Sequence, residues 1–307
     1  MTRAPITQVL QDVLLRRVLP GGGLADRPAG QYRTDATAWG TVALAASNAD
    51  RQSLDRLRSR LLREQQRDGR LCIESNRSDS YWPTPIAILA WRGDQACESA
   101  KDRAIAFVLT TTGNHYAAKS EEPAGHDTFL KGWPWISGTH SWIEPTAVAV
   151  IALNSEGYGG HARIREAKAM ILDRQLPHGG WNYGNSFVFG QELRPMPETT
   201  GAALASLAGM VDRQHIEKAL DYLLNEVGRL TTPISLGWSL IGLAAWNLWP
   251  ANGVALVERC LVNQSRFGEY DTSSLSLLFL GALAGQPDDN LNVSGFPRAG
   301  RLENASQ

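Results

Sequence analysis

Cysteine, net charge of one sign and long apolar runs are all scarce here, and each scarcity excludes a class of protein. The 307 residues include only 3 cysteines, far apart and without a CxxC pair, which excludes a disulfide framework and a cysteine-rich zinc site. Basic and acidic residues number 30 and 31, so nucleic acid is not an expected partner. No apolar run reaches the ~18 residues of a membrane span.

Targeting and cofactor motifs are missing as well. Residues 1–17 have no signal-peptide pattern, so we expect a cytoplasmic protein, with peripheral membrane contact left open. The chain has no GxSxG, P-loop or GxGxxG motif, and Gly21–Gly23 follows no strand. Its six histidines are scattered and none lies near Cys260. We therefore expect no cofactor and no metal.

What the sequence does contain is one type of segment, six times over. Each copy is an Ala/Leu-rich run that starts with Asp, Thr, Ser or Pro, residues that favour helix N-termini. A helix that is apolar on every side is buried all round. The runs lie at 34–47, 82–91, 143–153, 197–209, 231–246 and 270–285.

Amphipathic, charged segments alternate with these apolar runs, and their spacing also predicts helices. They lie at 4–18, 51–66, 98–112, 162–175, 213–228 and 253–264. Six such pairs form an internal repeat of helical hairpins, which fits an open solenoid or a closed ring. Closure is favoured, because an open stack would expose the apolar helices. We predict an all-α fold of six hairpins in one domain, 1–285, followed by a loose tail, 286–307.

Several amphipathic helices end in a related signature. The clearest copy, AKAMILDRQLPHGGWNYGN at 167–185, places Gln175 at a helix end and Trp181 after two glycines; weaker copies are 57–71 and 258–271. The pattern resembles the Gln-Trp repeat of the squalene cyclase and protein prenyltransferase superfamily, over roughly residues 30 to 285. The resemblance implies an (α/α)6 toroid. The alternative for Trp181 is a purely structural packing residue.

The resemblance to the cyclase branch implies one candidate acid. A DxDDTA motif opens an inner helix there, and its middle Asp protonates an alkene or epoxide. Asp35 falls on that position in RTDATA, but Arg33 and Ala36 replace the flanking carboxylates. A proton donor must be protonated and poorly solvated, and Arg33 would hold Asp35 ionised. The alternative for Asp35 is a helix N-cap.

A second candidate acid has the same offset in HSWIEPTA, 140–147. Glu144 occupies the middle position there, and His140, four residues upstream, is placed to hydrogen-bond its carboxyl. Aromatic neighbours raise a carboxyl pKa and stabilise a developing cation; those crowding this loop are Trp133, Trp135 and Trp142. The alternative is a carboxylate that only stabilises the helix start.

Two further carboxylates, Glu198 and Asp271, also open apolar helices. In a closed ring with parallel inner helices, all four acids would approach one mouth, above an aromatic cavity. Candidate substrate contacts are therefore Trp39, Trp82, Trp133, Trp135, Trp142, Trp181, Tyr183, Glu198, Trp238, Tyr270 and Asp271.

The leading functional hypothesis is a class II terpene cyclase-like enzyme, an isomerase or lyase acting on an apolar polyprenyl substrate. Its reaction would begin by protonation from Glu144 or Asp35. One alternative is a non-catalytic toroid that binds an isoprenoid, a glycan or a protein. Another is a saccharide hydrolase or lyase with paired carboxylates.

Overall fold

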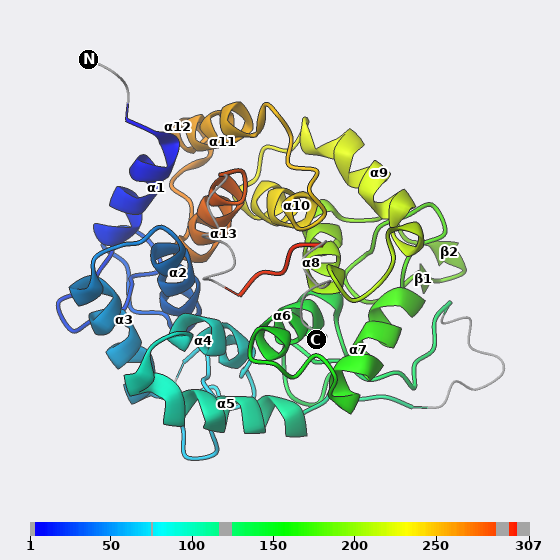
Figure 1. Ribbon diagram of the computed structural model, residues 1–307, viewed down its shortest axis with the longest axis horizontal. Helices are drawn as coiled ribbons and strands as arrows, with labels where there is room; N and C mark the ends of the chain where they lie inside the picture. The colour runs from blue at the N-terminus through cyan, green and yellow to red at the C-terminus, as the bar shows by residue number, and fades with distance from the viewer. Residues whose placement is uncertain (1–3, 75, 117–124, 287–294, 300–307) are drawn as a thin grey trace, which may run out of the picture.

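The regular structure is almost entirely helical, which confirms the predicted fold class. The computed structural model describes residues 4–74, 76–116, 125–286 and 295–299. Figure 1 shows two concentric layers of helices. The inner layer consists of α2 (Thr34–Ala46), α4 (Pro83–Trp91), α6 (Ile143–Ser155), α8 (Pro197–Leu207), α10 (Pro233–Ala245) and α13 (Thr272–Leu283). The outer layer consists of α1 (Ile6–Leu15), α3 (Arg51–Glu64), α5 (Glu98–Thr110), α7 (Ala162–Asp173), α9 (Glu217–Val227) and α11 (Gly253–Val262).

The ring is closed, as the apolar second helix of each hairpin predicted. Each inner helix packs against the next, and α13 packs against α2 (Figure 1). The Arg17 side chain, just after α1, donates to the Thr272 hydroxyl at 2.9 Å, and this hydroxyl donates to the Ala25 carbonyl at 2.6 Å. These bonds join the two ends of the chain, so no inner helix is left with an exposed apolar flank.

Close approach between α8 and α10 depends on two glycines. A Cβ atom on Gly201 would lie 2.2 Å from the Trp238 carbonyl oxygen, and one on Gly242 would lie 2.5 Å from the Gly201 carbonyl oxygen. Any larger residue would force the two backbones apart. The contact therefore sets the position of Trp238 within the ring.

A threonine near the start of each of four inner helices holds the preceding loop. Its hydroxyl accepts a hydrogen bond from the backbone N–H of a buried residue in that loop, which would otherwise lack an acceptor. The pairs are Leu24 with Thr37 (2.9 Å), Leu71 with Thr84 (2.9 Å), Trp133 with Thr146 (2.9 Å), and Trp181 with Thr200 (3.0 Å). These loop-threonine bonds fix where each inner helix begins, and we did not predict them.

The aromatic residue of the repeat bonds to the end of the preceding outer helix. The Trp181 indole donates to the Ile171 carbonyl of α7 at 2.6 Å, and the Tyr270 hydroxyl donates to the Cys260 carbonyl of α11 at 2.9 Å. Trp133 makes the same type of bond to Val108 of α5, at 2.8 Å. The repeat thus satisfies carbonyls that a helix end leaves open.

Most of the predicted loose tail, 286–307, lies outside the described residues, so this expectation stays a prediction. The described part of the tail, 295–299, lies inside the ring in Figure 1, drawn in red. The Phe296 side chain is only 2% exposed, and its ring lies 6.3 Å from that of Trp238. The Ala299 N–H donates to the Ala245 carbonyl at 2.7 Å. An aromatic residue able to fill the centre of the ring is what holds this segment.

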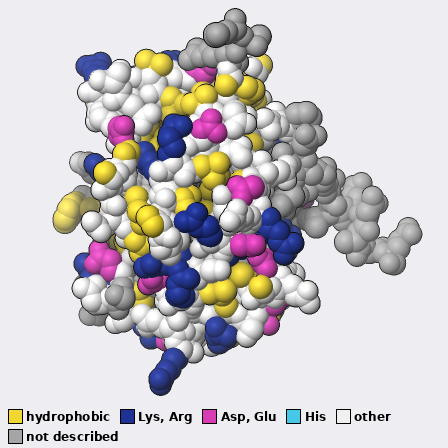
Figure 2. Space-filling model, turned by 90° about the vertical axis from the view of Figure 1, so that its left-hand side faces the viewer, with side chains coloured by type: hydrophobic (Ala, Val, Ile, Leu, Met, Phe, Trp, Pro, Cys, Tyr) yellow, Lys and Arg dark blue, Asp and Glu magenta, His cyan; other side chains and the backbone are white. Residues whose placement is uncertain are grey.

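The remaining elements are short. They are the 3-10 helices η1 (Gln95–Cys97) and η2 (Arg213–His215), the one-turn helix α12 (Gln264–Phe267), and an antiparallel hairpin of β1 (Phe187–Val188) and β2 (Gln191–Glu192). Within the described ranges, no helix combines the length and apolar character needed to cross a membrane. On the side of the molecule seen in Figure 2, acidic, basic and hydrophobic side chains are intermingled.

Candidate functional site

Three hydrogen bonds between side chains link the starts of inner helices at one end of the ring, which we call the mouth. Each bond joins a carboxylate in the first turn of one inner helix to a donor near the start of another. The pairs are Trp238 with Glu144 (3.1 Å), Ser235 with Glu198 (2.8 Å), and Ser273 with Asp35 (3.2 Å). These bonds place each of the three acids beside the start of another inner helix, while the predicted meeting of all four acids, Asp271 included, stays a prediction.

Glu144, in the first turn of α6, is the carboxyl with the most perturbed environment. Its side chain is only partly exposed, and its Oε1 accepts from the Trp238 indole N–H. The pKa of Glu144 is raised to about 7, chiefly because burial penalises the charged carboxylate; Glu198 adds to this rise and the Trp238 hydrogen bond opposes it. Glu144 can therefore hold a proton near neutral pH and release it in a reaction.

Glu198, in the first turn of α8, is a carboxylate with well-defined donors. It is 8% exposed and accepts from the Tyr183 hydroxyl at 2.7 Å and from the Ser235 hydroxyl at 2.8 Å. The pKa of Tyr183 is raised to about 12 by burial, by its bond to Glu198 and by the charges of Glu198 and Glu144. The two glutamates thus share one electrostatic environment with Tyr183 beside them.

Asp35 is held by an arginine, as Arg33 in the sequence suggested. Both Asp35 oxygens accept from the Arg33 guanidinium at 2.8 Å, and the hydrogen bond with Asp35 raises the pKa of Arg33. This bidentate pair uses the ionised form of the carboxyl. Asp35 is therefore engaged in an ion pair with Arg33.

His140 does not have the partner that we expected. No hydrogen bond joins it to Glu144 in the described structure; its ring lies against that of Trp142, with centroids 4.1 Å apart. Burial, together with the charge of Arg174, lowers the pKa of His140. The reason is that the His140 side chain packs beside Trp142 and faces a separate cavity.

Comparison with known proteins adds evidence on the fold. No family model and no curated protein matches the chain. Solved structures do match. The GH76A α-1,6-mannanase from Salegentibacter sp. HEL1_6 has a TM-score of 0.62 at 13% identity, over 91% of this chain and 98% of that chain. The type II terpene cyclase MstE from Scytonema has a TM-score of 0.58 at 14% identity, over 91% and 96%.

A third match, an α-amylase from Clostridium perfringens, has a TM-score of 0.65 at 9% identity, over 93% of this chain and 100% of that chain. The chain has the α/α toroid fold. At these identities the likeness concerns the fold alone, and it spans both a cyclase and glycan-cleaving enzymes. Function has to be argued from the site.

The aromatic residues of the toroid fall into two groups. Trp39 and Trp238 lie inside the ring, edge to face at 5.7 Å, and Trp82 meets Trp135 in the same manner at 5.1 Å. Trp142 lies directly before α6, beside the mouth. The residues that bond outer-helix carbonyls lie between the layers instead; Trp133, Trp181 and Tyr270 are the members of this second group.

This second group corrects part of the predicted contact set. Trp181 has no exposed surface and Trp133 is 3% exposed, since both indoles fill the space between an inner and an outer helix. Asp271 caps α13 by accepting from the Ser274 backbone N–H at 2.9 Å. These three residues are therefore explained by packing and capping.

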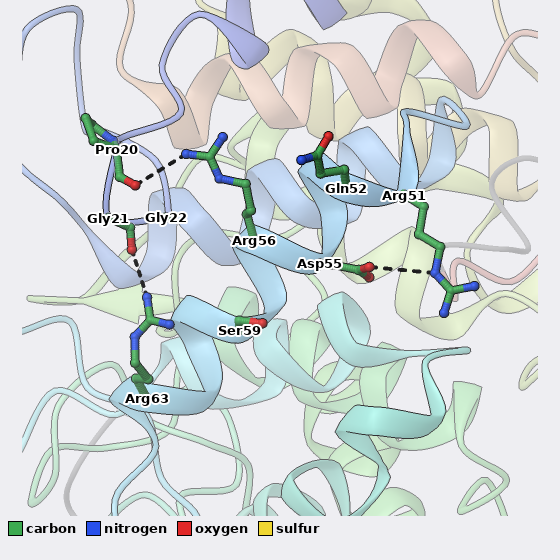
Figure 3. Close-up of a pocket in the computed structure, with 9 residues that line it drawn as sticks. All are labelled: Pro20, Gly21, Gly22, Arg51, Gln52, Asp55, Arg56, Ser59 and Arg63. Atoms are coloured by element: carbon green, nitrogen blue, oxygen red, sulfur yellow. Dashed lines mark hydrogen bonds and ion pairs between the residues drawn. The ribbon is translucent and has the colours of Figure 1, made fainter.

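Among the cavities of the described structure, two bear on the search for a site, and neither is lined by Glu144, Glu198 or Asp35. The groove in Figure 3 follows α3 on the outer layer, where Arg56 and Arg63 donate to the Pro20 and Gly21 carbonyls at 3.4 and 2.8 Å. These bonds tie α3 to the turn after α1. The second cavity, about 910 Å³, lies beside the mouth and is lined by His140, Arg174 and Asn185 among others.

Sequence reasoning missed several residues of the site. Ser235 and Ser273 donate to the carboxylates, and Phe296 packs under Trp238. The two serines lie near the starts of predicted helices. Serine is common at such positions, so nothing in the sequence marked these two as partners of the carboxylates. Arg174 had no distinguishing signal either, because it ends an amphipathic helix rich in charged residues.

Proposed function

We propose that this protein is an acid–base enzyme that cleaves a bond to an oxygen leaving group, of the glycosidic type, at the mouth of the toroid. Glu144 is the proton donor and Glu198 the second carboxylate. The observation that carries the proposal is the pair itself: Glu144 with a pKa raised to about 7, beside Glu198 with two hydroxyl donors. A buried carboxyl that holds a proton, next to a carboxylate that accepts two hydrogen bonds, suits the roles of an acid and a base.

The strength of the acid favours oxygen over carbon as the proton acceptor. A carboxyl with a raised pKa is a weak acid, matched to a bridging oxygen that becomes basic as its bond to carbon breaks. In the proposed step, Glu144 gives its proton to that oxygen while the C–O bond breaks. Glu198 either takes a proton from the attacking water or attacks the carbon itself.

Two features of the surroundings support this reaction. Tyr183 is 43% exposed and lies beside Glu198, where an aromatic face can contact a sugar ring. The mannanase and the amylase with the same fold act, by their names, on glycans. Both features are independent of the Gln-Trp repeat, on which the resemblance to the cyclase superfamily rests.

Proton-initiated cyclisation of a polyprenyl substrate is the second candidate. Its support is the aromatic cluster of Trp39, Trp238 and Phe296 below Glu144, and the fold shared with a cyclase solved with geranylgeranyl dihydroxybenzoate. However, these three side chains are each no more than 3% exposed, so they line no space that a substrate chain could occupy. Asp35, the residue at the cyclase acid position, is also ion-paired.

The test is turnover by wild type, Glu144→Gln, Glu198→Gln and Asp35→Asn on two panels, one of oligosaccharides and one of polyprenyl compounds. We expect release of reducing ends from the first panel, with each glutamate variant losing about 10²–10⁴-fold in kcat. Asp35→Asn is the control and should retain activity. Cyclised products from the second panel would establish the second candidate. Binding without turnover on either panel, unchanged in Glu144→Gln, would indicate a non-catalytic toroid.

A further inference from the structure

A cavity beside the mouth is lined by a buried arginine that has no counter-ion among the described residues. Arg174 follows α7 as its C-cap residue and is 4% exposed. It forms no ion pair within the described residues, where its Nη1 donates to the Ser141 carbonyl and its Nε has no acceptor. Burial lowers the pKa of Arg174 to about 10. A buried charge is costly unless it is paired, so this guanidinium is unusual.

The neighbouring carboxylates do not supply the missing partner. Asp127 and Asp173 influence Arg174 through their charges, but both are exposed and neither lies within ion-pair distance. Asp173 is engaged elsewhere, since its carboxylate accepts from the Asp127 backbone N–H at 2.8 Å. Arg163 of the same helix shows the contrast, because it pairs with Glu166 at 2.8 Å.

A second polar group at the cavity is also without a partner. His140 Nε2 is buried and makes no hydrogen bond in the part of the chain that the structure describes. The cavity has a volume of about 910 Å³, and its other polar lining residues are Asn114, Tyr116, His126, Thr128, Thr139 and Asn185. The Asn114 amide and the Thr128 and Thr139 hydroxyls already donate to backbone carbonyls. The groups left for an anion are therefore the Arg174 guanidinium and the His140 ring.

Two short segments connect this cavity to the mouth. Segment 140–144 carries His140 at the cavity and Glu144 at the mouth. Segment 183–185 carries Tyr183 at Glu198 and Asn185 at the cavity, and the Ile143 N–H donates to the Tyr183 carbonyl at 2.8 Å. The two sites are therefore adjacent parts of one surface.

We propose that this cavity binds an anionic group, a carboxylate or a phosphate, through Arg174 and His140. The planar guanidinium suits the two oxygens of either group. That the anion belongs to the substrate cleaved at Glu144, as in an acidic glycan, rests on the proposed function. Anion binding itself does not, and it can be measured without turnover.

The experiment measures binding of two probes, inorganic phosphate and D-glucuronate, by calorimetry and by thermal shift, at constant ionic strength set with chloride. We expect at least one probe to bind wild type and raise its Tm, since a ligand that binds the native state stabilises it. Arg174→Gln should raise the Kd roughly tenfold or more, Arg174→Lys should raise it less, and His140→Gln should also weaken binding. Which probe binds more tightly separates a carboxylate ligand from a phosphate ligand.

Arg163→Gln is the matched control, because Arg163 lies on the same helix but already has a carboxylate partner. It should bind the probes as wild type does. The proposal is overturned if neither probe binds, or if Arg163→Gln and Arg174→Gln lose binding equally. Arg174→Lys keeps the test valid if Arg174→Gln does not fold. Glu144→Gln should lose turnover and retain probe binding, so failure of the two proposals can be told apart.

Discussion

At the scale of single residues, Glu144 and Asp35 show how neighbours decide what a carboxyl can do. Both occupy the second position of an inner helix. Arg33 pairs with Asp35, whereas Glu144 faces an indole N–H and another carboxylate. The first environment favours the charged form and the second the protonated form. Equal positions in the repeat therefore carry different chemistry.

The raised pKa of Glu144 predicts a pH-dependent stability. Between the ordinary carboxyl pKa of about 4.5 and the native value of about 7, the folded state holds a proton that the unfolded state releases. The free energy of unfolding should therefore fall as pH rises through this window, by about 3 kcal/mol. Urea denaturation from pH 4 to 8 measures it. Glu144→Gln should remove the fall.

Glu217→Gln, a change at an exposed carboxylate at the start of outer helix α9, is the control for this prediction and should keep the wild-type pH dependence. An unchanged pH dependence in Glu144→Gln would show that another group titrates in this window.

At the scale of elements, each inner helix begins within two residues of the predicted position, with the largest differences at α10 and α13. The apolar runs and their capping residues explain this agreement, since both signals are local. The loop-threonine bonds were not predictable, because the N–H that each threonine accepts lies 13 or 19 residues away.

The loop-threonine bonds should stabilise the fold measurably. Thr146→Val keeps the shape of the side chain but leaves the buried Trp133 N–H without its acceptor. We expect the free energy of unfolding to fall by about 1–3 kcal/mol, measured in urea. Thr110→Val is the matched control, because Thr110 is exposed and bonds only within its own helix. Equal losses in both variants would contradict this role.

At the scale of the whole molecule, the ring is closed in two senses. The packing of α13 against α2 completes the circle of inner helices, which is the lateral closure, and the buried Phe296 side chain packs inside it, which is the central closure. The lateral closure was predicted from the number and apolarity of the hairpins. The central one was not, since a lone phenylalanine in a polar tail gives no periodic signal. It also bears on the proposed function, because Phe296 packs against Trp238, whose indole donates to Glu144.

The central closure gives a prediction for the tail. Phe296→Ala should lower the free energy of unfolding by about 3–5 kcal/mol, as expected for removing a fully buried aromatic ring. Chemical denaturation of this variant measures the loss. Phe267→Ala is the control, because Phe267 is 65% exposed and should be close to neutral. A Phe296→Ala protein as stable as wild type would mean that the segment does not hold the centre.

The sequence by itself determined the helices, their alternation and the closed toroid, because periodicity, helix caps and uniform apolarity act over a few neighbouring residues. It also identified Glu144, Glu198 and Asp35 as acids at helix starts. Only the tertiary structure decided which acid is shielded, where Trp181 and Tyr270 point, and that Arg174 lines a cavity without a counter-ion among the described residues. Those outcomes depend on contacts between residues that are far apart in the chain. Such contacts form only in the folded protein, and they set the burial and the electrostatic environment of each side chain.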